Sequence, residues 1–558
     1  MRILWDFGRI SLMKYALNTL PTDIDSLKKI IIFLHNNVAK IAEEKKSLQQ
    51  NHDAILQEKI KTDAELATVR LKLDYLLEQF KLSKQRQFGR SSEKDLIQRD
   101  IFDEAGVTLS VEAAEDVAEE TEVITYERKK ENTGKAKRTS LPDYLPREVK
   151  TYDIPESEKK CACCGSEKTC FSKEVTEQLK VIPPQIVVIS HQRLKYCCKP
   201  CEGEISIAPK PDLFLPKSIA DASLVAYTII LKYVDHLPLY RQEHIWARNK
   251  IELPRNTTCA WVMKSATLCE PLVNVMRLEL IKSGYIQADE TPTQVLNEPK
   301  RKNTQKSYMW VYRKAIGAPL ILYEYQETRE AKHPKRFLVG FKGHLQTDAY
   351  SGYDWSDEMP DVVHIACMTH GRRPFAELQK AAKKSKGLAY QALEIIGVLY
   401  RIEAEIKDKT VEEKYQIRQE QAKPQLDLLQ AWLSKHVSQA PPKGKLGQAM
   451  RYLINHWQKL IRYINDGRLH IDNNAIENDI RPFALGKKNW LFYGNPRGAK
   501  AGAIFYSLLI TAKANQLNEH AYLTFVFNRI RACKTEDDYR KLLPGYLTED
   551  ETKQLALK

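Results

Sequence analysis

Three acidic residues that lie far apart in the sequence have the chemistry of a metal-dependent phosphodiester site. Asp289 and Asp348 each close a short stretch of strand type, in GYIQADETPTQV and GHLQTDAYSGY. Glu477 follows a polar Asp-Asn-Asn cluster that is typical of a helix N-terminus, with Ile476 and Ile480 on one face of that helix. Hard divalent cations take oxygen ligands, and a pair of them can clamp the attacking and leaving oxygens of a phosphodiester. We therefore predict that these three carboxylates hold Mg²⁺ or Mn²⁺.

The first two carboxylates need a sheet to bring them together. Apolar, β-branched and aromatic residues predict five strands, at residues 285–295, 308–313, 320–325, 343–347 and 362–367. Three strands followed by a helix and further strands are typical of an RNase-H-like mixed α/β sheet. In that order Asp289 lies on the first strand and Asp348 at the end of the fourth, so the two would be neighbours. Helices over residues 373–468 would interrupt this core before Glu477.

The cysteines indicate a second metal site of a different kind. Cys161 with Cys164 and Cys198 with Cys201 form two C-x2-C pairs on either side of an alternating stretch, which predicts a zinc ribbon. Four thiolates around one Zn²⁺ form a closed, structural site with no open position for substrate. Three further thiols of the cluster could replace a ligand: Cys163, Cys170 and Cys197. The alternative is a coincidental group of buried cysteines.

The N-terminal region has the pattern of a coiled coil. Apolar residues recur at the a and d positions of a heptad from Ile24 to Phe80, in a stretch almost free of Gly and Pro. Lys45, His52 and Lys59 interrupt the a positions in the middle. We expect self-association into at least a homodimer; the alternative is one long helix that packs on its own domain.

The charge of the chain favours a polyanionic partner, most simply DNA. Basic residues outnumber acidic ones by 87 to 72, for a formal net charge of +15. Residues 213–282 could contain a helix-turn-helix whose second helix begins near residues 256–258, although an ordinary helical hairpin fits the pattern equally well. The residues that we predict to contact DNA are Lys84, Arg86, Arg90, Arg255, His370, Arg372, Arg481, Lys487, Lys488, Trp490 and Arg497. The alternatives are a structural role for His370 and a solvated helix end for the segment after the coiled coil.

Other features of the sequence restrict the class of protein. No run of about 18 apolar residues exists, so a membrane span is not expected. The N-terminus lacks a signal-peptide core and cleavage site, and translation could begin at Met1 or Met13. Cysteines spaced as metal ligands fit a reducing cytoplasm. There is no G-x-S-x-G or Walker A motif, which disfavours serine hydrolases and P-loop NTPases.

Over nearly its whole length the chain resembles the IS66-family transposases of bacterial insertion sequences. The likeness rests on an ordered set of motifs: FGRSSEK, C-x2-CG…Y-x-C-x2-CE, KYVDHLPLYRQE, ADETP, TDAYSGY, CMTHGRRPF, LYRIEAE, and the segment from DGRLHIDNNAIENDIRPF to TAKANQLN. The resemblance puts a catalytic DDE triad on Asp289, Asp348 and Glu477. Departures at Asn478, in CMTHGRR and at Asn249-Lys250 leave an inactive copy as an alternative.

The resemblance implies a bacterial, nucleoid-associated enzyme that binds the ends of its element and cuts and joins DNA strands without ATP. It also implies that small accessory proteins of the same element take part. Three rival interpretations remain: a non-catalytic zinc-ribbon and coiled-coil DNA-binding regulator, a structural coiled-coil adaptor, and an RNase-H-like nuclease that cuts without joining.

The expected fold class is multidomain α+β. The predicted order is a coiled coil and basic segment (22–100), a charged linker (101–145), a zinc ribbon (146–212), a helical DNA-binding region (213–282), a catalytic core in two parts (283–372 and 469–530) around a helical insertion (373–468), and a C-terminal tail (531–558).

Overall fold

The computed structural model describes residues 21, 23–88, 149–150, 159, 163, 166–167, 170, 186–196, 206–382 and 386–556. The chain divides into two compact units. One, here called the helical unit, takes in the N-terminal helix with His370–Ile402 and Glu420–Trp457. The other, the sheet unit, takes in Glu93–Thr369, Glu403–Gln419, and the chain from Gln458 onward. All three predicted catalytic carboxylates belong to the sheet unit.

The sheet unit is built on a five-stranded mixed sheet in the order β5-β4-β3-β6-β7. Its strands are β3 (Tyr285–Gln294), β4 (Lys306–Lys314), β5 (Leu320–Gln326), β6 (Gly343–Thr347) and β7 (Val362–Ala366). The first three pair antiparallel, whereas β6 runs parallel to β3 and β7 runs parallel to β6. All five predicted strands are therefore confirmed, with small differences at their ends.

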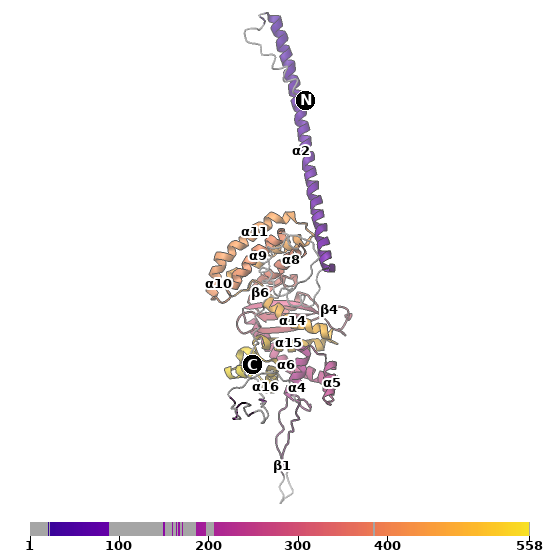
Figure 1. Cartoon of the computed structure of the whole chain (residues 1–558), viewed down its shortest axis with the longest axis vertical. Helices are drawn as coiled ribbons and strands as arrows, with labels where there is room; N and C mark the ends of the chain where they lie inside the picture. The colour runs from indigo at the N-terminus through magenta and orange to yellow at the C-terminus, as the bar shows by residue number, and fades with distance from the viewer. Residues whose placement is uncertain are drawn as a thin grey trace. The chain divides into compact units, whose positions relative to one another are not determined.

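The strand sequences explain why the sheet is buried. Met309–Tyr312 in β4 and Leu320–Tyr323 in β5 are runs in which every residue is buried, as is typical of strands covered on both faces. Helix α14 (Asn474–Trp490) packs on β3 and β4, and α15 (Pro496–Ala514) packs on β5 (Figure 1). The hydroxyls of Ser507 and Thr511 in α15 accept hydrogen bonds from backbone N–H groups of β5, at 2.8 and 2.9 Å. These bonds satisfy donors that the edge strand would otherwise present to other chains.

A glycine sets the register of β6 on β3. Gly343 has φ 128°, and a Cβ at this position would lie 2.1 Å from the carbonyl oxygen of Gly284. The next residue, His344, donates its N–H to that same carbonyl at 2.9 Å. Only glycine permits this approach. The resulting register pairs Tyr285 with His344 and Gln287 with Gln346.

Helices that precede and helices that follow the strands in the sequence complete the core of the sheet unit. Ahead of the sheet come α4 (Ala222–Tyr233), α5 (Leu239–Arg248) and α6 (Arg255–Ile281); after α15 come α16 (Glu519–Arg529), α17 (Glu536–Arg540) and α18 (Glu549–Leu555). Helix α6 packs on α15 and α17, and α4 packs on α16. Residues 213–282 therefore share one apolar core with the sheet. Other short helices are α7 (Lys332–Phe337), α10 (Val411–Ile417) and α13 (Trp457–Ile461), and one of the 3-10 segments is Ser351–Glu358.

The helical unit contains the long N-terminal helix α2 (Ile24–Phe88) together with α8 (Met368–Ala382), α9 (Leu388–Glu405), α11 (Lys423–His436) and α12 (Lys445–Asn455). Helix α2 is continuous over 65 residues. Its heptad side chains are 48–68% exposed: Ile31, Leu34, Val38, Ile41, Leu48, Ile55, Leu66, Val69, Leu73, Leu76 and Phe80. An apolar stripe left this open to water is typical of a helix that pairs with another chain.

Several predictions concern residues beyond this description. Cys161, Cys164, Cys198, Cys201 and Arg90 lie outside the described residues, as does the predicted linker. Lys84 and Arg86 fall within helix α2, but their side chains are not among the described ones. Short strands β1 (Lys195–Tyr196) and β2 (Ser206–Ile207) pair antiparallel on either side of the second cysteine pair. Within the ranges given above, no helix has both the length and the apolar character that a membrane span requires.

Candidate catalytic site

The two aspartates lie at matching positions on adjacent parallel strands. The last pair of residues in register between β3 and β6 is Gln287 with Gln346, and Asp289 and Asp348 each follow two residues later. Because side chains alternate along a strand, Asp289 projects from the same face as Gln287, whereas Asp348 stands in the bend directly after β6. The register set by Gly343 thus brings the predicted pair together.

A tight turn holds the Asp348 side chain. One carboxylate oxygen of Asp348 accepts the N–H of Tyr350 at 2.9 Å, across Ala349 at φ 63°. The hydroxyl of Thr347 accepts the N–H of Ala349 at 3.1 Å and pairs with Nε2 of the buried His364 at 2.9 Å. A non-glycine residue in the left-handed region is strained, and such strain persists where the surroundings dictate the backbone. The turn therefore fixes the direction of the carboxylate.

A network of polar side chains joins both strands to the segment that leads into α14. Gln346 accepts from the Tyr285 hydroxyl at 2.6 Å and from the Gln287 amide at 2.9 Å. Its own amide donates to the carbonyl of His470 at 2.8 Å, and the His470 N–H donates to the Tyr285 hydroxyl at 3.1 Å. Buried polar groups joined in this way specify one arrangement, because any shift leaves several of them unpaired.

Glu477 reaches the site from the first turn of α14. Its side chain is 8% exposed, and Ile476 and Ile480, which were predicted to lie on one face of this helix, are both buried. A carboxylate in the first turn of a helix is favoured by the helix dipole. The approach to α14 is held by Arg418, which pairs with Glu403 at 2.6 Å and donates to the carbonyls of Tyr463, Asp466 and Leu469.

Electrostatics shows that the three predicted carboxylates converge. Burial raises the pKa of the Asp289 carboxyl well above its ordinary value, and the negative charges of Glu290, Asp348 and Glu477 raise that pKa further. The effect of a charge on a pKa weakens with distance, so these three carboxylates belong to the surroundings of Asp289. A group of carboxylate oxygens with excess negative charge is the donor set that a hard divalent cation fits.

Sequence reasoning missed Glu290 and its partners. The Glu290 side chain is buried, accepts from Arg329 at 2.5 Å, and accepts from the Tyr353 hydroxyl at 3.1 Å. The Arg329 guanidinium also lies 3.9 Å from Asp348 and stacks 3.7 Å from the centroid of the Tyr350 ring. The motif ADETP gave the only signal, a second acid directly after Asp289. On a strand this neighbour faces away from Asp289, and its arginine comes from another segment.

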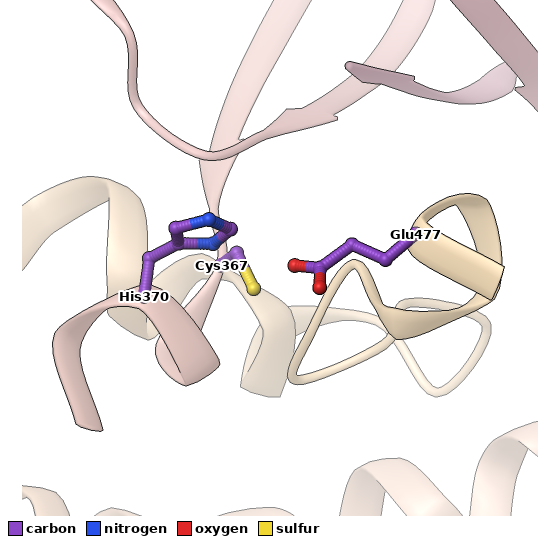
Figure 2. Close-up of side chains that lie close together, drawn as sticks. All are labelled: Cys367, His370 and Glu477. Atoms are coloured by element: carbon purple, nitrogen blue, oxygen red, sulfur yellow. The ribbon is translucent and has the colours of Figure 1, made fainter. Parts of the chain in front are cut away.

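Cys367 supports the start of α14. Its Sγ accepts the N–H of Asn473 at 3.2 Å, and it lies within 4.8 Å of a carboxylate oxygen of Glu477 (Figure 2). Thiol sulfur is too soft a ligand for Mg²⁺, so a structural role suits Cys367 better. Asp472, a rival ligand by sequence, accepts from the N–H and the side-chain amide of Asn474 at 3.2 and 2.9 Å. These bonds form an Asx turn just ahead of α14, whose N-cap residue is Asn473.

The predicted DNA-contacting residues are spread over several elements. Arg255 is exposed at the start of α6, and His370 lies in the first turn of α8. Arg372 is buried in the helical unit, with its guanidinium 5.8 Å from the centroid of the Tyr400 ring. Lys487 and Arg481 on α14 are half-buried, whereas Lys488 and Arg497 are exposed. The Trp490 ring packs against Phe483 and Tyr493, with centroids 5.7 and 4.6 Å away.

Comparison with known families matches four segments of the chain. A model described as the transposase IS66 family matches residues 217–501, about half of the chain. Models described as the zinc-finger binding domain of transposase IS66 and as the IS66 C-terminal element match residues 158–202 and 507–544. A model described as transposase C of IS166 homeodomain matches residues 75–149.

Curated relatives cover most of the chain. It is 31% identical over 437 residues to uncharacterized protein y4jD of Sinorhizobium fredii (strain NBRC 101917 / NGR234), which is 75% of this chain and 83% of that protein. It is 28% identical over 548 residues to uncharacterized protein y4qI of the same strain, which is 95% of this chain and 98% of that protein.

Proposed function

The chain belongs to the IS66 family of transposases, and we propose that it cuts and joins DNA at the ends of an insertion sequence with Asp289, Asp348 and Glu477 as catalytic carboxylates. One observation carries the proposal: hydrogen bonds join β3 and β6 to the segment that leads into α14, so carboxylates from these three elements are held near one another. The charges of Asp348 and Glu477 accordingly raise the pKa of Asp289. Asp348 follows Asp289 by 59 positions and Glu477 follows Asp348 by 129, so only the tertiary fold can bring these residues together.

We assign the sheet unit to the RNase-H-like class. The order β5-β4-β3-β6-β7, with three antiparallel strands followed by two parallel ones, supports that assignment. So does the position of the predicted acids, with one on the central strand β3, one at the end of its parallel neighbour, and one on a helix that packs on β3.

Asp289, Asp348 and Glu477 would hold Mg²⁺ or Mn²⁺. Bound there, the ions would supply charge for the attacking and leaving oxygens of a phosphodiester. The chain's own residues fix the geometry: the Asp348 turn and the Tyr285, Gln287 and Gln346 network set the carboxylates before substrate arrives. Pre-set ligands cost no reorganisation at the moment of reaction.

The reaction would proceed in two displacements at phosphorus. In the first, a water oxygen bonds to the phosphorus at the element's end and loses a proton, while the 3′ oxygen leaves and takes one up. In the second, that 3′-OH bonds to a phosphorus of target DNA, and the target's own 3′ oxygen leaves. One phosphodiester is broken and one formed in the second step, so no ATP is required.

The zinc-finger family match supports Zn²⁺ in this chain, and we assign its ligands to Cys161, Cys164, Cys198 and Cys201. We infer a homodimer or higher assembly through α2, because its apolar heptad residues are exposed. DNA is the macromolecular partner that the family implies. Small accessory proteins of the same element would assist.

The test is an assay of strand cleavage and strand joining on a DNA fragment that carries the element's end. The full chain is incubated with that fragment and a target plasmid, with Mg²⁺, with Mn²⁺, or with a chelator. Metal-dependent nicks and joined products support a transposase. Nicks without joined products would indicate a nuclease, and binding without any reaction would indicate a regulator or an inactive copy.

A further inference from the structure

The turn between α14 and α15 presents two large apolar side chains to solvent. Leu491 is 61% exposed and Phe492 is 45% exposed, although both stand between helices that are packed in the core. The neighbouring aromatics behave differently: Trp490 packs on the core and Tyr493 is buried within it. The flanking rings are packed in the core, whereas Leu491 and Phe492 are not, so packing of the core does not explain why this turn carries two large apolar residues.

The backbone that presents this pair is strained. Leu491 has φ 64° and ψ −56°, and the Phe492 N–H donates to the carbonyl of Trp490 at 2.8 Å. This is a three-residue γ-turn with a positive φ at its centre, a rare and strained form. Glycine would adopt this conformation more readily than leucine. Strain of this kind concentrates at functional sites.

The base of the turn is fastened to the sheet unit. The Tyr493 N–H donates to the carbonyl of Gln294 at 3.0 Å, and its carbonyl accepts the N–H of Leu296 at 2.9 Å. The Asn297 amide donates to the carbonyl of Gly494 at 3.0 Å. The exposed pair therefore projects from a fixed base, so contact with a partner costs little ordering entropy.

The sequence on either side of the turn carries one sign of charge. Between Asp479 and Glu519 the sequence has no acidic residue and six basic ones: Arg481, Lys487, Lys488, Arg497, Lys500 and Lys513. Lys488, Arg497 and Lys500 are exposed. Burial lowers the pKa of Lys487, and the positive charges of Lys306 and Lys488 lower it further, so cations crowd this surface. Exposed cations on both sequence flanks of an apolar pair are complementary to a polyanion that has apolar layers inside, which describes stacked DNA bases.

We propose that the Leu491–Phe492 turn is a wedge that inserts between DNA bases while Lys488, Arg497 and Lys500 hold the adjacent phosphates. The proposal rests on the proposed function and extends it to how the DNA is deformed. Apolar side chains that enter a base step unstack it and kink the duplex. The basic neighbours supply the sequence-independent part of the affinity.

The wedge would act at a distance from the reacting phosphate. Tyr493 bridges to Val295, six residues along the chain from Asp289 on β3. At about 3.3 Å per residue this separation is roughly 20 Å. That length corresponds to about six base pairs at 3.4 Å each. The distortion would therefore fall inside the same bound duplex, a few base pairs from the cut.

The experiment uses the full chain and end-bearing duplexes in which 2-aminopurine replaces one adenine at a time. Its fluorescence rises when the base is unstacked. For wild type we expect a several-fold rise at one or two neighbouring positions. For the double variant Leu491→Ala, Phe492→Ala we expect loss of that rise and an affinity lower by on the order of ten-fold. Val339→Ala, which shortens another exposed apolar side chain, is the matched control and should behave as wild type.

A charge variant separates the two parts of the site. Lys488→Ala with Arg497→Ala should reduce the slope of log affinity against log salt by about two, yet keep the fluorescence rise at saturating protein. The proposal is overturned if the apolar double variant keeps the rise, or if wild type cuts and joins DNA without unstacking any base. It is also overturned if the double variant binds and unstacks DNA as wild type does but no longer binds another protein. If wild type unstacks bases but never cuts them, the wedge stands and the proposed function fails.

Discussion

The side-chain amide of Asn473 donates to the backbone carbonyl of Ala288, 3.3 Å away and 185 residues earlier in the sequence. Asn473 immediately precedes α14, which carries Glu477, and Ala288 immediately precedes Asp289. This bond, together with the 3.3 Å bond from Gln287 to the carbonyl of Asp472, ties the third carboxylate to the strand of the first. The predicted site is therefore held by side chains that bear no charge themselves.

Asn473→Ala should lower kcat for strand cleavage by at least about ten-fold, because a ligand displaced by 1 Å can cost more than that. KM for DNA should change little, since Asn473 is fully buried and cannot touch the duplex. Steady-state cleavage kinetics measure both. Asn489→Ala, at an exposed position of the same helix, is the control. An unchanged kcat in Asn473→Ala would show that the bond does not position Glu477.

Asp289→Asn should stabilise the protein when no divalent cation is present. The substitution removes the Asp289 carboxyl, whose pKa is raised by burial and by three neighbouring carboxylates. The free energy of unfolding should therefore rise at neutral pH, because the unfolded chain holds the ionised carboxylate at no such cost. Added Mg²⁺ should stabilise wild type and have little effect on the variant. Chemical unfolding with and without Mg²⁺ measures this, with the exposed Glu358→Gln as control. Equal stabilisation of both proteins by Mg²⁺ would place the ion elsewhere.

The stability of the sheet unit should fall on acidification because of His364. Burial lowers its pKa to about 4, and nearby Lys459 contributes. The unfolded chain has the higher pKa, about 6.5, so it binds the proton more tightly. Stability from neutral His364 is thus complete above pH 6.5 and is lost as pH falls toward 4, with a slope of at most about 1.4 kcal/mol per pH unit. Denaturant unfolding between pH 4.5 and 7 should show a smaller slope in His364→Gln and the wild-type slope in His244→Gln. Identical slopes in all three proteins would contradict the assignment.

Leu491→Gly should raise the apparent melting temperature and weaken DNA distortion together. Relief of the positive φ at Leu491 should contribute about 1 kcal/mol, less the entropy that glycine loses on folding. A gain in stability with a loss of function is expected where strain serves activity. Thermal unfolding and 2-aminopurine fluorescence on the same preparation give both values. Leu428→Gly, at an exposed position inside α11, is a contrast and should destabilise. A lower melting temperature for Leu491→Gly would mean that the turn is not strained.

Local pattern was enough to predict the strands. Apolar runs such as those in β4 and β5 extend over whole strands, and Asp289 and Asp348 come at the points where β3 and β6 can present them. The third carboxylate could be predicted only as a helical residue. Its place beside β3 depends on bonds between residues 185 positions apart, for which the sequence has no local signal.

The direction of a side chain was harder to predict than the element that carries it. A basic stretch with aromatics suggested Trp490 as a DNA contact, but periodicity alone does not reveal that a γ-turn after α14 would turn Leu491 and Phe492 outward. Glu290 was missed because its partner, Arg329, comes from the segment after β5. Such pairings depend on the tertiary fold.

The measurement that tests the central claim most directly is strand cleavage and joining by single variants of the three carboxylates. Asp289→Asn, Asp348→Asn and Glu477→Gln keep side-chain size and are compared with wild type and with Asp472→Asn, in Mg²⁺ and in Mn²⁺. We expect each of the three to bind the element's end with near wild-type affinity and to lose cleavage and joining by at least about 1,000-fold, whereas Asp472→Asn stays active. Wild-type activity in any one of the three variants would contradict the assignment of that carboxylate.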